Sequence, residues 1–199
     1  MFLKSITKKE IQQLPIRSFE GNIFIVDNHE KLEKVIPIIK EQTIFGFDTE
    51  TKPAFRKGKI NKVALLQLSN SSQAFLFRLN KIGLTDPLVE IFSSKKITKV
   101  GAAIKDDIRN LKKIKLFQSN QFIELQDVVK LFDIKNYSIR KISAIVLNMR
   151  ISKGQQLSNW ENEQLTIAQQ RYAATDAWVC YLVYNKLKAL IEVKDEDCP

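Results

Sequence analysis

Short apolar runs alternate with longer amphipathic stretches along the chain, and the two patterns predict different elements. Strands are predicted at 22–26, 43–48 and 97–100, and the runs 62–68 and 73–79 form a hairpin across Asn70-Ser71-Ser72. Apolar positions at helical spacing predict helices at 28–40, 85–92, 102–115, 125–132, 138–147 and 166–191. Strands that come first, followed by alternating helix and strand, predict an α/β fold in which helices flank a mixed β-sheet.

Length and composition indicate one globular domain. The chain has 199 residues, of which 44% are hydrophobic and 27% charged, and it shows no repeat or Gly/Ser linker. We expect the domain proper at 21–191, preceded by an N-terminal extension at 1–20 and followed by an acidic tail at 192–199. The longest apolar runs are far below the ~18 residues of a membrane span.

Cysteine and histidine usage excludes several kinds of catalysis. The cysteines Cys180 and Cys198 form no paired motif, so a reduced, cytoplasmic setting is the simplest interpretation. His29 is the single histidine and stands where a helix opens, so we expect it on the surface. These counts argue against the usual zinc sites and against a serine hydrolase. Catalysis would then depend on carboxylates, hydroxyls, amines or metals held by oxygen.

The chain is strongly basic, with a formal net charge of +10. Lysine and arginine gather around 52–62, 95–115 and 130–153, whereas the C-terminal end is acidic. A basic surface of this size favours binding of a polyanion, and nucleic acid is the commonest polyanion. Solubility in a lysine-rich proteome is the alternative explanation.

Acidic residues stand at positions where folding alone would place apolar groups. In the strand that ends Phe47-Asp48-Thr49-Glu50, Asp48 and Glu50 share one face, ~7 Å apart, although a frayed strand end would also explain them. In the next acidic helix, Asp107 falls on the stripe of Ala103, Ile104, Leu111 and Ile114, whereas Asp106 falls on the solvated face. A buried ion pair is the alternative for Asp107.

The last predicted helix carries a further acid on its apolar stripe. Asp176 is the one charge among the stripe residues, and Tyr172 lies one turn before it. Burying an unpaired carboxylate costs several kcal/mol or forces it to take a proton. The other members of the stripe are Ala168, Val179, Val183, Leu187 and Leu190.

One arrangement accounts for all of these acids, namely a shared site for divalent cations. Asp48, Glu50, Asp107 and Asp176 carry four negative charges, which two Mg²⁺ or Mn²⁺ ions would neutralise. Two such ions about 4 Å apart are used for in-line attack on phosphodiesters. That chemistry also agrees with the basic surroundings.

Three motifs then carry a resemblance to a known family. They are Phe47-Asp48-Thr49-Glu50, Val100-Gly101 followed by Asp107, and Tyr172-Ala173-Ala174-Thr175-Asp176. In this order they resemble the motifs of the DEDD 3′–5′ exonucleases, and the tyrosine resembles that of the tyrosine subclass (DEDDy). The segments 62–68 and 158–160 resemble the branch that holds ribonuclease D and the Werner-type exonuclease domain. The similarity runs from about residue 21 to residue 188.

The resemblance implies a ribonuclease H-like fold and a two-metal mechanism. If the family's roles apply to the matching residues, Asp48 bridges both ions. Glu50 and Asp176 then hold the ion that binds the attacking water, and Asp107 acts on the second ion, partly through water. Tyr172 would orient that water. Metal would supply most of the acidification, because the ordinary pKa of tyrosine is near 10. Trp160 is expected to pack beneath the last helix.

Contacts to nucleic acid are expected just after the first motif. Lys57, Lys59 and Lys62 could follow phosphates, and Phe55 could wedge against a terminal base. The sequence therefore predicts a metal-dependent 3′–5′ exonuclease acting on 3′ ends of single-stranded or frayed nucleic acid. It would release nucleoside 5′-monophosphates and use no membrane and no organic cofactor. Trimming of RNA 3′ ends, a non-catalytic nucleic-acid-binding module and an endonuclease of the same fold remain alternatives.

Overall fold

A computed structural model describes residues 2–54 and 61–196. In these residues one mixed sheet has the strand order β1-β4-β3-β2-β5-β6. β3 is antiparallel to both β2 and β4, and the remaining neighbours are parallel. The strands are β1 (Asn22–Val26), β2 (Ile44–Thr51), β3 (Val63–Ser69), β4 (Gln73–Arg78), β5 (Thr98–Gly101) and β6 (Phe122–Glu124).

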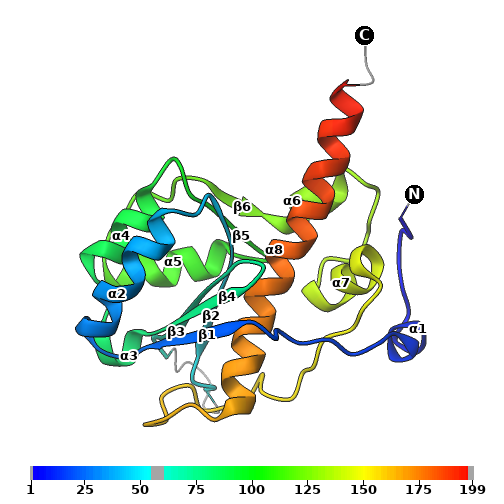
Figure 1. Ribbon diagram of the computed structural model, residues 1–199. Helices are drawn as coiled ribbons and strands as arrows, with labels where there is room; N and C mark the ends of the chain where they lie inside the picture. Colours follow the sequence, from blue (N-terminus) through cyan, green and yellow to red (C-terminus); the bar gives the residue numbers. More distant parts are fainter. Residues whose placement is uncertain (1, 55–60, 197–199) are drawn as a thin grey trace.

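Helices cover both faces of the sheet, as Figure 1 shows. One face packs against α2 (His29–Lys40), α3 (Leu79–Ile82), α4 (Asp86–Ser93) and α5 (Lys105–Ile114). The other face carries the long helix α8 (Ile167–Glu196), beyond which lie α1 (Lys8–Gln13), α6 (Leu125–Lys130) and α7 (Ile139–Leu147). The predicted mixed sheet flanked by helices is thus confirmed.

The predicted elements are found with small shifts of their ends, and three were not predicted. The hairpin of β3 and β4 and the long last helix are confirmed. The prediction that a helix starts at residue 102 is wrong, because α5 begins at Lys105 after Ala103, whose φ is 63°. β2 is also longer than the predicted strand 43–48, since it continues to Thr51. The helices α1 and α3 and the strand β6 are short, which leaves too few residues to show a period.

The close approach of α8 to β2 is built into the sequence. A Cβ atom at Gly46 would lie 1.7 Å from the carbonyl oxygen of Ala177, so only glycine fits here. On the helix, Ala173, Ala174 and Ala177 are fully buried and present small side chains to the sheet. Since Asp176 precedes Ala177 and Asp48 follows Gly46 by two positions, this contact brings the two aspartates together.

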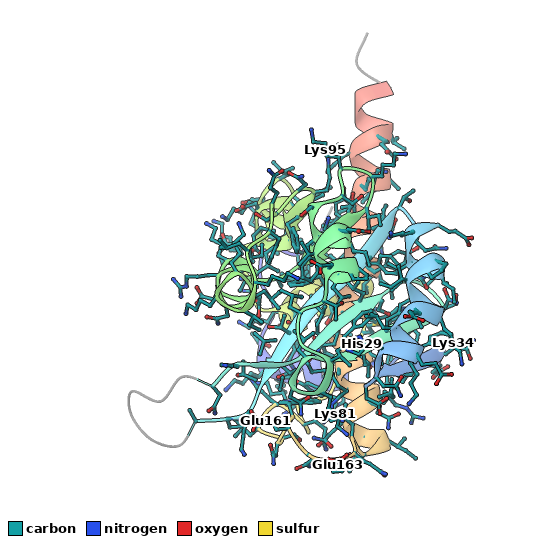
Figure 2. The ribbon with its side chains drawn as sticks, turned by 90° about the vertical axis from the view of Figure 1, so that its left-hand side faces the viewer. His29, Lys34, Lys81, Lys95, Glu161 and Glu163 are labelled. Atoms are coloured by element: carbon teal, nitrogen blue, oxygen red, sulfur yellow. The ribbon has the colours of Figure 1, made fainter. Side chains whose placement is uncertain are left out.

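The outer surface carries the solvated charges that the sequence analysis expected. His29 is the first residue of α2 and is exposed, as predicted. Figure 2 shows His29 and Lys34 along this helix and Lys81 near Glu163, with which it forms an ion pair of 2.6 Å. In the described part of the chain, no helix is both long enough and apolar enough to cross a bilayer.

Candidate active site

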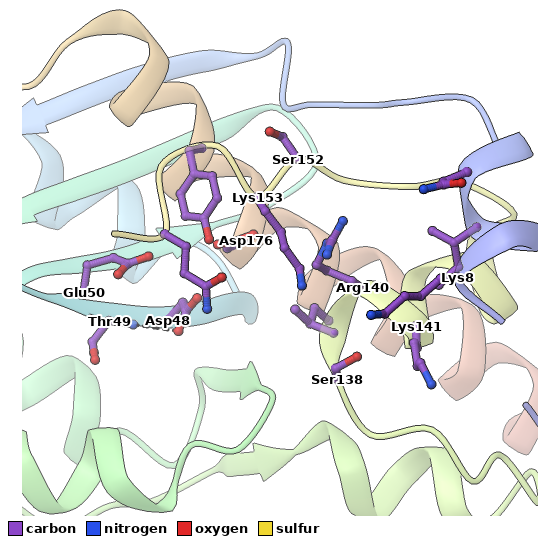
Figure 3. Close-up of a pocket in the computed structure, with 15 residues that line it drawn as sticks. Lys8, Asp48, Thr49, Glu50, Ser138, Arg140, Lys141, Ser152, Lys153 and Asp176 are labelled. Atoms are coloured by element: carbon purple, nitrogen blue, oxygen red, sulfur yellow. Dashed lines mark hydrogen bonds between the residues drawn. The ribbon is translucent and has the colours of Figure 1, made fainter. Parts of the chain in front are cut away.

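A pocket of about 660 Å³ opens beside the N-terminal half of α8. Asp48 and Glu50 from β2 and Tyr172 and Asp176 from α8 line one side of it. Figure 3 shows the labelled acids together on this side and basic side chains toward the other. The pocket therefore combines a group of carboxylates with a group of cations.

The strand β2 supplies the first two acids by its alternation. Asp48 and Glu50 lie on the α8 face of the sheet, as Gly46 does, whereas Phe47, between Gly46 and Asp48, packs into the core on the opposite face. Asp48 pairs in register with Gln67 of β3, and the register shifts after Glu50. Both acids are half-buried. The prediction that they share one face is confirmed.

Asp107 reaches the same region from the first turn of α5. The Thr49 hydroxyl donates a hydrogen bond to its carboxylate, which ties α5 to β2. As predicted, Asp106 is exposed instead, and Arg109 pairs with it at 2.9 Å. The predicted apolar stripe is wrong at its ends: Ala103 precedes the helix and is exposed, and Ile114 is 37% exposed. Leu111 is fully buried and Ile104 nearly so.

A residue that the sequence analysis missed fixes the start of this helix. The Glu124 carboxylate accepts hydrogen bonds from the backbone N–H groups of Ala103 and Ile104, at 2.8 and 2.9 Å. It also accepts one from Gln126, at the start of α6. An anion at a helix N-terminus is favoured by the unpaired amides there. No pattern in the sequence marks Glu124, because its partners come from a distant segment.

Asp176 and Tyr172 stand one above the other on α8. The Tyr172 hydroxyl donates a hydrogen bond to the Asp176 carboxylate, and the Asp176 residue is 7% exposed. The ring of Tyr172 packs on Trp160, with centroids 6.0 Å apart, and Trp160 is fully buried, as predicted. The predicted stripe holds from Asp176 to Leu187, whereas Ala168 and Leu190 at its ends are exposed.

Burial and mutual repulsion raise the pKa values of the acids. Burial raises the pKa of Glu50 to about 8, with a further contribution from the charges of Asp176 and Asp107. The pKa of Asp48 lies well above its usual range for the same two reasons. Burial raises the pKa of Asp176 to about 7, although the hydrogen bond from Tyr172 and the charge of Arg140 oppose the shift. The pKa of Asp107 is also raised by burial.

Tyr172 responds to the same surroundings. Burial, followed by the charges of Asp176 and Glu50, raises the pKa of its hydroxyl far above the usual value. The hydroxyl therefore stays protonated at neutral pH and acts as a hydrogen-bond donor. A raised pKa of this kind, at a site where several like charges meet, is typical of functional sites.

The donor set suits a divalent cation of the hard type. Its oxygens come from carboxylates on β2, α5 and α8, and neither sulfur nor imidazole takes part. Within residues 2–54 and 61–196, no three acidic, histidine or cysteine side chains stand in a ready-made metal-binding group. Repulsion between the negatively charged carboxylates favours keeping them apart when no cation is bound. The carboxylates would have to rotate to bring their oxygens onto one ion. The residues thus fit a hard divalent cation by the chemistry of their donor atoms.

The nucleic-acid contacts predicted after the first motif have different outcomes. Phe55, Lys57 and Lys59 lie outside the described residues. Lys62 is exposed and lines a separate pocket with Asn110 and Lys113 rather than the pocket of the acids. The structure therefore does not bring Lys62 into the pocket of the acids, because Lys62 precedes β3, whose first residue Val63 pairs with Thr51, beyond Glu50.

The cations that do line the acidic pocket were not among the nucleic-acid contacts predicted from the sequence. They are Lys8 of α1, Arg140 and Lys141 of α7, and Lys153 of the following loop. Only the general gathering of lysine and arginine at 130–153 pointed toward three of them. Lys8 had no signal of this kind, since it belongs to a six-residue helix near the N-terminus.

Comparison with known proteins gives the class to which this site belongs. Residues 23–192 match the family described as 3′-5′ exonuclease, so the chain belongs to this family. It is 30% identical over 198 residues to the mouse bifunctional 3′-5′ exonuclease/ATP-dependent helicase WRN, a match that covers 92% of this chain and 14% of that protein. It is 32% identical over 184 residues to the putative 3′-5′ exonuclease R431 of Acanthamoeba polyphaga mimivirus, covering 83% and 44%. The chain thus spans less than half of either relative.

Solved structures agree on the fold. The EXO domain of Aedes aegypti Nibbler aligns with a TM-score of 0.76 at 20% identity, covering 89% of this chain and 94% of that one. Escherichia coli RNase D, an exoribonuclease involved in structured RNA processing, aligns with a TM-score of 0.75 at 19% identity, covering 86% and 46%. The predicted ribonuclease H-like fold is confirmed, and so is the resemblance to the exonuclease family.

Proposed function

We propose that this chain is a 3′–5′ exonuclease that uses two divalent cations, Mg²⁺ or Mn²⁺, to hydrolyse terminal phosphodiesters. The observation that supports this most is the meeting of Asp48, Glu50, Asp107 and Asp176, from three separate elements, beside a pocket lined with cations. An ordinary folding requirement would separate or pair these acids, since like charges in a partly buried site repel. Membership of the exonuclease family supports the same conclusion.

The residues divide into metal ligands and positioning groups. We propose that Asp48, Glu50 and Asp176 would hold the ions. Asp107, already held by the Thr49 hydroxyl, would act partly through water. The bound ions would supply an acidified water as nucleophile and stabilise charge on the phosphate.

Tyr172 orients the attacking water in this proposal. Its raised pKa keeps the hydroxyl protonated, so it can donate a hydrogen bond but is a poor base. Trp160 packs against its ring and restricts where the hydroxyl can lie. The hydrogen bond from Tyr172 to Asp176 would also hold that carboxylate in one orientation.

The substrate proposed is the 3′ end of a single-stranded or frayed nucleic acid. Arg140, Lys141 and Lys153 line the pocket beside the acids and can attract the phosphates of a strand. An exposed 3′ terminus is needed because the scissile bond must reach side chains that are half-buried or buried. The proposal covers DNA and RNA alike.

Digestion of matched substrates tests this function. Linear DNA and RNA strands labelled at the 5′ end, and a circular single strand, are incubated with EDTA, Mg²⁺ or Mn²⁺. We expect a ladder that shortens from the 3′ end and nucleoside 5′-monophosphates as product, only with metal and only from linear strands. Cleavage of the circle would indicate an endonuclease instead, and the absence of any metal-dependent product would refute the proposal.

A further inference from the structure

The segment that precedes the family match, residues 2–20, is packed into the domain beside the active site. Ile6 and Ile11 are buried in the core between α6, α7 and α8. The ring of Phe2 meets Phe132 edge-on at 5.7 Å, and the Ile6 N–H donates to the Asn136 side chain at 2.9 Å. The segment is therefore fixed in place rather than free.

Its second half is held as firmly. Ile16 pairs in a parallel bridge with Arg150, whose backbone N–H donates to the Pro15 carbonyl at 3.0 Å. The Arg150 guanidinium donates to the Leu14 carbonyl, and the Phe19 N–H donates to the Thr175 hydroxyl, each at 2.9 Å. Because Thr175 is the neighbour of Asp176, this segment contacts α8, the helix that carries Asp176, directly.

Between these anchors, the segment lines two pockets that meet at the site. Lys8 and Gln12 line the pocket of the acids, and Arg17 and Ser18 line a second pocket of about 240 Å³. The two pockets share Ser152, Tyr172 and Asp176. A segment outside the family match thus forms part of the wall on both sides of Tyr172.

The position of Lys8 indicates what it would bind. Figure 3 shows Glu50 and Asp48 at one side of the pocket, Lys153 and Arg140 farther along, and Lys8 with Lys141 at the far side. Lys8 is exposed, at the first position of α1, where a capping box formed by Thr7 and Glu10 holds the helix start. A strand whose 3′ end lies at the acids would pass its upstream phosphates along this row of cations.

We propose that the N-terminal segment forms one wall of the nucleic-acid channel and that Lys8 binds a backbone phosphate upstream of the scissile bond. This inference rests on the proposed function, because the acids define where the 3′ end lies. Lys8 is a point charge on a flexible stem and suits a phosphate without reading sequence. Its contribution should depend on strand length, since a dinucleotide is too short to reach the far side of the pocket.

Charge reversal at two adjacent lysines provides a matched test. Lys8→Glu and Lys9→Glu change the charge equally, both positions are exposed on α1, and Lys9 does not line the pocket. Affinity for a labelled single strand of about 12 nucleotides is measured in EDTA by fluorescence anisotropy, which needs no hydrolysis. We expect Lys8→Glu to weaken binding about fivefold to tenfold and Lys9→Glu to change it less than about twofold.

Salt and length provide the second readout. Lys8→Gln should reduce the slope of log affinity against log salt concentration by about 0.7, as loss of one phosphate contact on a single strand does. In hydrolysis with Mn²⁺, the loss of kcat/KM in Lys8→Gln should be greater for the long strand than for a dinucleotide. Melting temperatures of the variants check that the segment stays folded.

Three outcomes separate this inference from the proposed function. Equal effects of Lys8→Glu and Lys9→Glu, or a loss in Lys8→Gln that is the same for dinucleotide and long strand, would overturn the role of Lys8 while the exonuclease proposal stands. A wild-type protein that binds strands but hydrolyses none would overturn the proposed function. In that case a selective loss of binding in Lys8→Glu would still support the channel wall.

Discussion

Replacing Glu50 by glutamine is expected to stabilise the metal-free protein at mildly alkaline pH. The pKa of Glu50 rises from 4.5 to about 8 in the fold, through burial and the charges of Asp176 and Asp107. Between these two pH values the folded state keeps a proton that the unfolded state has released. The free energy of unfolding therefore falls as pH rises from about 4.5 to about 8. One pKa unit corresponds to about 1.4 kcal/mol, and part of the repulsion is shared with the other acids. The free energy of unfolding therefore falls by roughly 2–5 kcal/mol over this pH range.

Thermal unfolding followed by circular dichroism in EDTA measures this loss. Above about pH 8, Glu50→Gln should melt roughly 5–15 °C higher than wild type, and the difference should shrink toward about pH 5. Glu33→Gln, an exposed position on α2, should melt like wild type at every pH. At a hundredfold excess over its Kd, Mn²⁺ should restore about 2.7 kcal/mol to wild type. If Glu50→Gln melts at or below wild type in alkaline EDTA, burial and the neighbouring acids do not disfavour the charged form of Glu50 in the fold.

Three further predictions concern other residues. Asp107→Asn should lower kcat/KM at least about tenfold while Asp106→Asn leaves it unchanged, as steady-state digestion would show; equal losses would contradict the assigned roles. Tyr172→Phe should lower kcat about tenfold to a hundredfold with little change in KM, and a change confined to KM would speak against orientation of water. Burial lowers the pKa of Lys99 to about 8, so urea unfolding of wild type should show stability rising with pH from about 8 to about 10.5, and Lys99→Met should remove this slope.

Much of the fold could be predicted because its elements carry their own periodicity. The stripe of α8 and the alternation in β2 identified Asp176, Asp48 and Glu50 without any tertiary information. Both patterns report burial, and a charge within them stands out for that reason. Asp107 was separated from Asp106 in the same way, although α5 begins later than the sequence indicated.

The rest of the site depends on contacts that no local pattern contains. Glu124 matters because β6 places it beneath the start of α5, far along the chain from Ala103. Lys8 and Arg17 line the site because a few apolar residues, Ile6 and Ile11 among them, anchor an irregular segment. Lys62 lines a separate pocket from the acids, which the sequence could not indicate because a basic run next to a motif does not show which pocket its side chains face.

Binding of Mn²⁺ tests the central claim most directly, namely that these carboxylates form a site for divalent cations. Isothermal titration calorimetry of wild type, Asp48→Asn and Asp106→Asn with Mn²⁺ compares an acid of the cluster with an exposed acid on α5 that Arg109 already pairs. We expect wild type and Asp106→Asn to bind two ions per chain, and Asp48→Asn to lose this binding together with hydrolysis of a 5′-labelled strand. Unchanged Mn²⁺ binding and hydrolysis in Asp48→Asn would contradict the account.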